Sequence, residues 1–555
     1  MKKHISSFLL LLFYFQIHGC IKQKQDSDQN TLSIIGEFHA TWVRNFNPFS
    51  PQGVSRWATV SCIYEPLFIF NHATGKYTPW LATDYIWKNN NRVLEVSIRQ
   101  NVKWSDASSF NANDVAFTFN LKKLYPGLDT RNSWDYLKKV VALNDSTVIF
   151  EFRRIYVPGF DDIAGQPIVP KHIWKDIPDP SKFPNESPVA TGPYTEIMRF
   201  ESQIFELGKN NYYWQNGKPE IEKLKFVAYP GNEQATLALI NGEVDWAGIY
   251  IPSIDRVYVE KDIKHHKYWF SKTGYSTMLY LNTKNQLFEN VNIRKAISYA
   301  IDREQVVKVG MNNYTSPANV SGLSGKMEDW HHKDFDLSEN WVRYDPVLSN
   351  NLFDEAGYLK DESGYRIKPD GSKLTLDIII ISGFSDWIRS AKVISQKLND
   401  IGIQSQVKTF DYGAWISRMQ KGEFEMAIGW SQKGANPYVF YRALMSSKYV
   451  KPIGEISDLN WHRFGLTEAD SLFYEFENTS NKKETREIMY KIQNLFIEHA
   501  PCIPLFAEAL WGECNTKKFV NFPSEKNPYA VLAPYSDSGN MIVLLNIKKR
   551  MLEEI

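Results

Sequence analysis

The residues best suited to metal chemistry are two pairs of adjacent histidines, His265-His266 and His331-His332. The second pair stands among four acidic residues: Glu328, Asp329, Asp334 and Asp336. Neighbouring side chains of a helix or a strand point in different directions, so adjacent histidines seldom share one ion. We therefore interpret both pairs as solvated loop residues, with metal binding at the second pair as the alternative. The sequence predicts no cofactor.

Motifs that carry enzymatic chemistry are missing from the sequence. There is no GxSxG elbow, Walker A loop, HExxH zinc motif or DxDxDG calcium loop. The stretch Gly322 to Lys326 is glycine-rich, but it lacks the spacing and the following Ser or Thr of a phosphate loop, so we interpret it as a turn. The acidic pairs are scattered, and none is singled out as general acid and base. The sequence therefore predicts a protein that is not an enzyme.

Cys20 ends a stretch that is typical of an export signal. A basic start, Lys2-Lys3, is followed by an apolar run over 5–17, which is too short to span a bilayer. The residues that end the run, Ile17 to Cys20, are similar to a bacterial lipoprotein box. We expect residues 1–20 to be a lipoprotein signal peptide and Cys20 to be the lipid attachment site, which would hold the protein at a membrane face.

Three further cysteines remain: Cys62, Cys502 and Cys514. They show no CxxC or Cys/His zinc spacing. An odd number allows at most one disulfide, and a bond between Cys502 and Cys514 stays open because spacing alone does not establish it. We expect stability to come from packing.

Length and composition describe a large protein of balanced charge. A chain of 555 residues predicts two to four domains. Without Lys2 and Lys3 the 64 basic residues become 62, against 63 acidic ones, so the charge does not favour nucleic acid as a partner. The chain has 17 Trp, 29 Tyr and 33 Phe. Many of these rings must lie in the core, but flat apolar rings with a polar edge also suit stacking on sugar rings, so the abundance of Trp is a pointer to the ligand type.

Hydrophobic periodicity predicts alternating strands and helices after a flexible polar tether over 21–31. Strands are expected at 32–35, 92–98, 147–152 and 374–381. Helices are expected from Asn113, as a capping residue, and over 232–242, 291–301, 387–401 and 484–499. This order predicts a mixed α/β protein with more than one lobe.

Several short motifs follow one another along the chain. They are Tyr64-Glu65-Pro66-Leu67, Pro79-Trp80-Leu81-Ala82, 98–106 continuing to 113–117, Ala190 to Tyr194, Gly242 to Asp245, and Asn292 to Arg303. Taken together, they resemble the family 5 extracellular solute-binding proteins of ABC transporters, the receptors for dipeptides, oligopeptides, nickel and oligosaccharides. Ala107 stands where the family usually has Gly. The resemblance extends from residue 32 to about 540.

The resemblance implies an α/β, two-lobed periplasmic-binding-protein fold with a hinge and a cleft, plus an extra subdomain in lobe one. The expected ranges are 32–276 for lobe one with the subdomain at about 62–189, 277–504 for lobe two, and 505–555 for a tail returning to lobe one. The chain would cross between the lobes near 272–280 and 504–511. The ligand would lie in the cleft, and closure would bury it before docking on the permease.

The segment 429–440 departs from the pattern of the peptide receptors. In those members the similar segment reads Trp-x-x-Asp, followed by Asp-Pro or Glu-Pro, and the first Asp takes the α-amino group of the peptide. Here Lys433 stands at that place and Asn436 replaces the second acid. Because a lysine repels an ammonium in a desolvated cleft, we expect the usual peptide anchor to be absent.

A neutral polyhydroxy ligand has no such conflict. The tail from Trp511 and the segment from Pro437 to Arg442 also resemble the oligosaccharide-binding branch, which takes cello- and manno-oligosaccharides. The resemblance implies these ligand contacts: Trp42, Asn45, Trp246, Tyr250, Trp430, Lys433, Asn436, Phe440 and Trp511. For each Trp, packing in a core is the alternative.

The sequence thus predicts a substrate-binding lipoprotein of an ABC importer that captures an oligosaccharide and delivers it to the permease. An oligopeptide or dipeptide receptor with a different anchor is the main alternative. A metal-chelate receptor, and an enzyme or signalling ectodomain on the same scaffold, are further ones. The expected partners are a small-molecule ligand, the membrane subunits of the permease and the membrane itself, with no nucleic acid. We expect a monomer outside the cytoplasm, lipid-anchored to the cell membrane or the outer membrane, in the periplasm or on the cell surface.

Overall fold

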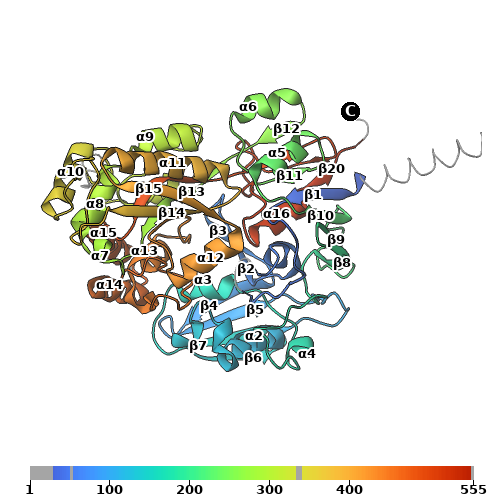
Figure 1. Cartoon of the computed structure of the whole chain (residues 1–555). Coiled ribbons are helices and arrows are strands. Elements are labelled where there is room, and N and C mark those ends of the chain that lie inside the picture. Colours follow the sequence, from blue (N-terminus) through green and yellow to red (C-terminus); the bar gives the residue numbers. More distant parts are fainter. Residues whose placement is uncertain (1–28, 51–53, 333–339, 552–555) are drawn as a thin grey trace, which may run out of the picture.

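The computed structural model of the chain describes residues 29–50, 54–332 and 340–551. The predicted signal peptide, Cys20 and most of the tether therefore lie outside the described residues. Figure 1 shows three bodies: lobe one at the upper right, lobe two on the left, and a subdomain below them.

Lobe one is built on a seven-stranded sheet in the order β12-β18-β11-β1-β10-β9-β8. Its strands are β1 (Thr31–Ile35), β8 (Tyr194–Glu201), β9 (Ile204–Lys209), β10 (Lys223–Val227), β11 (Trp246–Ala247), β12 (His266–Tyr268) and β18 (Glu513–Asn515). Strand β1 is central and pairs in parallel with β10 and β11, and all five of its residues are buried. Helices α5 (Asn232–Ile240) and α6 (Ile254–Val257) belong to the same lobe. The first strand and the helix predicted from residue 232 are both confirmed.

The subdomain is an antiparallel sheet with one long helix against it. The sheet order is β4-β5-β7-β6, from β4 (Ala82–Lys88), β5 (Val93–Ile98), β6 (Leu137–Asn144) and β7 (Thr147–Phe152). Beside it lie the hairpin β2 (Phe68–Asn71) and β3 (Lys76–Pro79) and the helices α2 (Ala112–Leu124), α3 (Gly159–Ala164) and α4 (Lys171–Trp174). The strands predicted at 92–98 and 147–152 are confirmed.

The cap of α2 lies two residues earlier than the sequence indicated. Asn111, and not Asn113, is the capping residue, and its side chain accepts a hydrogen bond from the Asn113 backbone N–H at 2.8 Å. Asp114 reaches back to the Asn111 N–H at 3.0 Å and completes a capping box. Two asparagines stand within one turn, and the reciprocal hydrogen bond that the Asn111 N–H donates to Asp114 selects the first.

Lobe two has a five-stranded sheet in the order β15-β14-β16-β13-β17. Its strands are β13 (Ser271–Leu281), β14 (Thr375–Ile381), β15 (Gln404–Phe410), β16 (Met426–Gly429) and β17 (Ile503–Leu510). Its helices are α7 (Gln286–Glu289), α8 (Val291–Tyr299), α9 (Arg303–Gln305), α10 (Pro346–Glu355), α11 (Ser385–Asp400), α12 (Tyr412–Lys421), α13 (Tyr438–Met445), α14 (Thr467–Asn478) and α15 (Lys482–His499). The continuous apolar run of β14 reflects its place inside the sheet, between β15 and β16.

The two segments expected to cross between the lobes are neighbours in space. They are β13 and β17, which pair antiparallel from Ser271 opposite Leu510 to Leu279 opposite Ile503. The pairing is irregular between Lys272 and Ser276, around Gly274, whose φ of +91° suits glycine. Two adjacent strands thus form the hinge, and a local irregularity lies within it.

The C-terminal tail returns to lobe one. It forms β18, β19 (Phe519–Val520), α16 (Gly539–Asn546) and β20 (Lys548–Lys549). On α16, Val543 and Leu544 join the core of lobe one, whereas Met541 and Leu545 join the core of the subdomain. Helix α16 therefore fixes the subdomain to lobe one.

The three cysteines of the described chain are free and buried. Cys502 lies in the core of lobe two, and Cys514 lies in that of lobe one, so the disulfide left open by the sequence does not form. Burial raises the pKa of the Cys62 thiol to about 12. Among the described residues, no helix is long and apolar enough to cross a membrane.

Candidate ligand site between the lobes

On the hinge side, the lobes meet backbone to backbone. The Asn232 N–H, at the start of α5, donates to the Gly383 carbonyl of lobe two at 3.0 Å. A Cβ on Gly231 would lie 2.5 Å from the Cα of Gly383, closer than real Cβ contacts come. Next to them, the rings of Phe38 and Phe384 meet edge to face at 5.8 Å. The two lobes are therefore in direct contact here, and this edge of the space between them is closed.

An aromatic wall stands on the lobe-two side. Trp430 follows β16 and is only partly buried, and its ring lies 5.0 Å from that of Trp415 and 5.9 Å from that of Trp461. Tyr412, at the start of α12, stacks on Trp430 at 6.3 Å with an interplanar angle of 17°. The Tyr280 hydroxyl donates to the Trp430 carbonyl at 2.9 Å. Rings held by other rings in this way are rigid.

Lobe one faces this wall with His39, whose ring lies 6.2 Å from that of Tyr412. His39 contacts Trp42 at 5.3 Å, and its Nε2 lies 3.0 Å from the Glu37 carboxylate. Trp42 itself is buried and packs edge to face on Phe205. Trp42 thus packs against His39 from the core of lobe one.

Lys433 lies beside β17, where its ammonium pairs with the Glu508 carboxylate at 2.7 Å. The Thr273 hydroxyl, on β13, also donates to Glu508 at 3.3 Å. Glu508 is nearly buried, with a side-chain exposure of 11 %. The positive charge of Lys433 is therefore neutralised within the protein.

Tyr250 and Trp511 meet beside the closed edge, with ring centres 5.4 Å apart. The Tyr250 N–H donates to the Asn232 side chain at 3.0 Å. From lobe two, the Arg389 guanidinium lies 5.0 Å from the centre of the Tyr250 ring. Burial raises the pKa of Asp386 to about 6, although backbone N–H groups at the start of α11 oppose this. Tyr250 thus lies against the start of α11 in lobe two.

Two other expected contacts are buried in cores. Trp246 is 1 % exposed, and its indole N–H donates to the Leu532 carbonyl at 2.5 Å. Phe440 is fully buried and packs on Tyr275 and Tyr441. In this closed conformation both side chains support the lobes from inside.

The two expected asparagines are engaged in local turns. The Asn436 side chain accepts the Tyr438 N–H at 3.0 Å, at the start of α13. The Asn45 side chain accepts the Asn47 N–H at 3.0 Å. Both asparagines remain partly exposed to solvent.

Several residues of this region were missed by sequence reasoning: Glu37, His39, Tyr412 and Glu508. Glu508 offered a signal, since it is a charged residue inside the otherwise apolar strand sequence Ile503–Leu510. The others stand in loops or at helix ends, where no periodicity marks them.

The histidine pairs do not form a metal site in the described part of the chain. No group of three or more His, Cys, Asp or Glu residues there is arranged to hold an ion. His331 contacts the Ser321 hydroxyl at 2.8 Å, and His265 contacts Asp262 at 2.9 Å. Asp334 and Asp336 lie outside the described residues.

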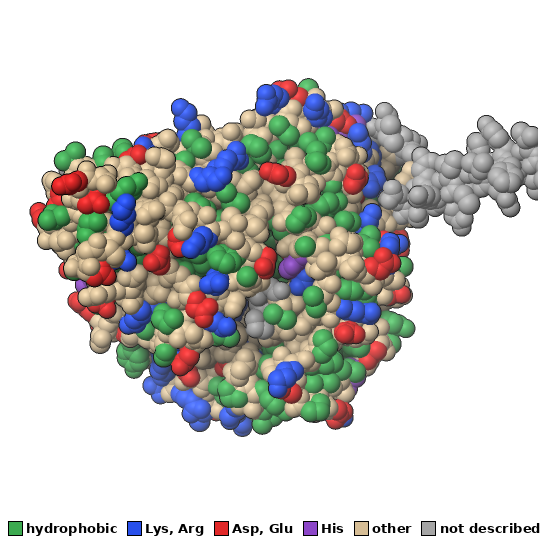
Figure 2. Space-filling model, in the orientation of Figure 1, with side chains coloured by type: hydrophobic (Ala, Val, Ile, Leu, Met, Phe, Trp, Pro, Cys, Tyr) green, Lys and Arg blue, Asp and Glu red, His purple; other side chains and the backbone are tan. Residues whose placement is uncertain are grey.

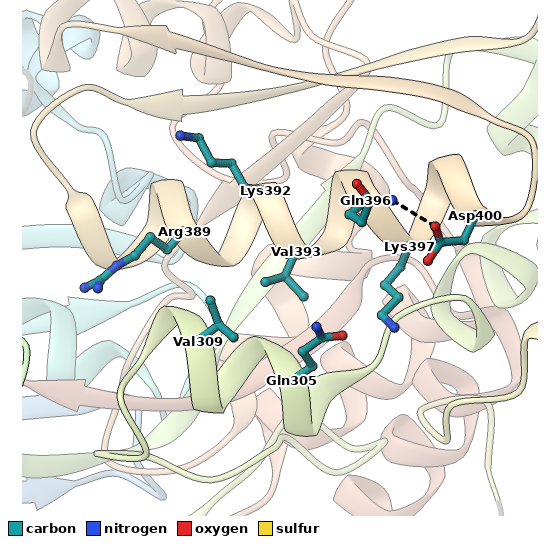
Figure 3. Close-up of a pocket in the computed structure, with 8 residues that line it drawn as sticks. All are labelled: Gln305, Val309, Arg389, Lys392, Val393, Gln396, Lys397 and Asp400. Atoms are coloured by element: carbon teal, nitrogen blue, oxygen red, sulfur yellow. Dashed lines mark hydrogen bonds between the residues drawn. The ribbon is translucent and has the colours of Figure 1, made fainter.

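Figure 2 shows the surface hollowed near the centre of the view, where the lobes and the subdomain meet. Two other grooves lie on lobe two alone. One, of about 440 Å³, runs between α11 and the short helix at Val306–Gly310, and Figure 3 shows Arg389, Lys392 and Lys397 along it. The second, of about 450 Å³, lies between α14 and α15. Neither groove contains an expected ligand contact.

The fold and the inter-lobe region define a class, that of binding proteins whose two lobes close on a ligand. A solved structure from Thermotoga maritima, a mannohexaose-bound periplasmic oligopeptide-binding protein of an ABC transporter, matches with a TM-score of 0.86 and 25% identity. The match covers 94% of this chain and 99% of that one.

Sequence comparison gives the family. The model of the bacterial extracellular solute-binding proteins, family 5 (Middle), matches residues 76–451, and the chain belongs to this family. The oligopeptide-binding protein AppA of Bacillus subtilis is 26% identical over 402 residues, covering 66% of this chain and 70% of AppA. The glutathione-binding protein GsiB of Shigella flexneri is 24% identical over 473 residues, covering 84% and 87%. The protein is thus a substrate-binding component of an ABC transporter and not an enzyme, as its sequence predicted.

Proposed function

We propose that this protein captures an oligosaccharide of the cello- or manno-type between its lobes and delivers it to the permease of an ABC importer. The ion pair between Lys433 and Glu508 carries the proposal. By the resemblance of segment 429–440, it would stand where peptide receptors of the family present a carboxylate to the α-amino group of the ligand. A lipid on Cys20 would keep the monomeric receptor close to the permease, outside the cytoplasm.

The Lys433–Glu508 pair disfavours a positively charged ligand for an electrostatic reason. A peptide ammonium that entered here would have to displace Lys433 from Glu508 in a partly desolvated space. A sugar hydroxyl can donate to a carboxylate, or accept from an ammonium, without breaking the pair. The pair therefore favours a ligand that is uncharged at this end.

The aromatic wall suits the same ligand. Trp430 keeps one accessible part while Trp415 and Trp461 hold it in place. A rigid ring that is already ordered loses little entropy when a sugar ring stacks on it. That a relative in this family was solved with mannohexaose supports this ligand class.

A peptide ligand is the second candidate, and AppA, an oligopeptide-binding protein, favours it. Peptide binding would need Lys433 to swing away so that Glu508 took the ammonium.

Isothermal titration calorimetry distinguishes an oligosaccharide ligand from a peptide ligand. Mannohexaose and cellohexaose should bind, whereas a mixed panel of tri- to pentapeptides should give no heat. Binding of peptides with no response to either sugar would overturn the proposal. The anchor is tested apart from the ligand: Cys20→Ser should abolish incorporation of labelled fatty acid in the bacterial host.

A further inference from the structure

Lobe two also touches the subdomain, at a place separate from the hinge-side edge. Its helices α13 and α14 lie on the side of lobe two that faces the subdomain (Figure 1). From the subdomain, the loop after β7 reaches these helices. The residues that bond across the contact are Arg154, Tyr156 and Val157 in that loop, Arg442 on α13 and Glu477 on α14.

Glu477 is the centre of this contact. Its carboxylate accepts a hydrogen bond from the Arg154 guanidinium at 2.5 Å, and its backbone carbonyl accepts the Val157 N–H at 2.9 Å. The side chain of Glu477 is 12 % exposed, and that of Arg154 is 32 % exposed. The guanidinium also lies 5.2 Å from the centre of the Tyr474 ring, on α14. A charge-assisted bond that is partly shielded from water is stronger than an ion pair in open solvent.

A second bond crosses the contact beside the first. The Arg442 guanidinium donates to the Tyr156 hydroxyl at 2.8 Å. On the subdomain side, Tyr156 is buried and stacks on Tyr136 with ring centres 4.2 Å apart. Further along the same face, Lys448 of lobe two pairs with Asp135 of the subdomain. The contact therefore joins two rigid surfaces through several polar bonds.

Glu477 is also connected to the segment predicted to bind the ligand. Its other carboxylate oxygen accepts the Tyr438 hydroxyl at 2.5 Å. Tyr438 is the first residue of α13, and its N–H donates to the Asn436 side chain at 3.0 Å. A series of bonded groups thus runs from the segment 429–440 through Glu477 to the subdomain.

We propose that Arg154 and Glu477 form a latch between the subdomain and lobe two, which stabilises the closed molecule and so sets ligand affinity without touching the ligand. The subdomain is fixed to lobe one by α16, whereas lobe two is joined to lobe one by the strands β13 and β17. Opening about these strands separates α14 from the subdomain and breaks the latch.

The latch acts on affinity through the closed fraction of the empty receptor. The apparent Kd is the intrinsic Kd divided by that fraction, so a latch that favours the closed form tightens binding. This role goes beyond the proposed function, because it applies to any ligand that is held between closed lobes. It also gives the extra subdomain a task of its own, which is to hold lobe two in the closed position.

Arg154→Gln and Glu477→Gln are the informative variants, since each removes one charge of the latch and Glu477→Gln keeps an oxygen for the Tyr438 hydroxyl. Arg153→Gln is the matched control, because Arg153 is the exposed neighbour of Arg154. Thermal unfolding checks that all variants are folded.

Hydrogen exchange of two backbone amides measures closure without any ligand. The Val157 N–H donates across the latch to Glu477, and the Asn232 N–H donates across the hinge-side edge to Gly383. A local disturbance at the latch would affect Val157 alone, whereas opening of the molecule would affect both amides.

In the ligand-free protein, both amides should exchange about fivefold faster in Arg154→Gln and in Glu477→Gln, and Arg153→Gln should leave both rates unchanged. The double variant should be no faster than either single one, because both changes remove the same pair. With mannohexaose in calorimetry, the two latch variants should bind about fivefold more weakly.

Unchanged exchange in a folded Arg154→Gln overturns the latch, and so does faster exchange at Val157 with an unchanged rate at Asn232. Neither result concerns the identity of the ligand, because the exchange is measured without one. Peptide binding by the unmodified protein, with no sugar response, overturns the proposed function instead and leaves the exchange test of the latch in force.

Discussion

The Lys433 ammonium and the Glu508 carboxylate lie 2.7 Å apart, one in the loop after β16 and the other on the hinge strand β17. Glu508 thus stands on one of the two strands that link the lobes, and Lys433 comes from lobe two. In the proposed site the pair would present the ligand with a neutral, hydrogen-bonding surface in place of a single charge.

Replacing Lys433 by an acidic residue should reverse the preference for an uncharged ligand. In Lys433→Asp, two carboxylates would stand together, and we expect sugar affinity to fall by about tenfold while some peptide affinity appears. Calorimetry with both ligand panels measures the change, and Lys451→Asp, at an exposed lysine, is the control. If neither affinity changes, Lys433 lies outside the ligand site.

Gly231→Ala should hinder closure. The residue has an extended backbone with φ of 175°, so alanine causes no local strain, but its Cβ would collide with Gly383 across the lobes. We expect a larger radius of gyration in the presence of ligand, by small-angle scattering, and weaker binding. Gly127→Ala, where no atom lies within 4 Å, should behave like the unmodified protein. An equally compact Gly231→Ala would mean that the edge is not closed in solution.

Trp430 and Trp246 should separate binding from stability. Trp430→Ala removes the proposed stacking face and should weaken sugar binding by about tenfold, with partial rescue in Trp430→Phe. Trp246→Phe loses a buried hydrogen bond to Leu532, so it should lower the melting temperature with little effect on affinity. The reverse pattern would move the ligand contact from Trp430 to Trp246.

Glu65 should make stability depend on pH. It is fully buried and accepts hydrogen bonds from Trp80 at 2.6 Å, Tyr213 at 3.0 Å and Trp214 at 3.2 Å. Burial raises its pKa from 4.5 to about 7 despite these bonds. The folded state therefore holds a proton that the unfolded state releases between these values.

The contribution of Glu65 is complete below pH 4.5 and is lost as the pH rises toward 7, by about 1.4 kcal/mol per pH unit. Denaturant unfolding from pH 4.5 to 8 measures this slope against that of Glu65→Gln, which should be flatter. Equal slopes would show that Glu65 is ionised in the folded protein throughout.

Periodicity and motif order predicted much of the fold. The buried run of β14 and the helix α11 follow from residue pattern alone, and their limits differ from the prediction by one or two residues. The cap of α2 was wrong by two residues because the choice between Asn111 and Asn113 depends on a reciprocal bond to Asp114.

The site was less predictable because it is assembled from distant segments. Trp430 and Lys433 stood out through the family pattern of one segment. The partner of Lys433 is 75 residues further on, and His39 and Tyr412, whose rings meet across the lobes, are separated by most of the chain. Such neighbours follow from the arrangement of lobes, which local spacing does not encode.

The pairing of β13 with β17 also gives the molecule a simple topology for engineering. The chain enters lobe two at Ser271 and leaves it at Leu510, which are opposite residues of one antiparallel ladder. Opposite Cα atoms in such a ladder are about 5 Å apart. Lobe two is therefore an insertion into a host that holds both β1 and β20, and a linker of a few glycines could replace it without stretching the host. The receptor can thus be divided into a fixed half, to which any N-terminal attachment belongs, and an exchangeable half that could be replaced by the equivalent lobe of a relative.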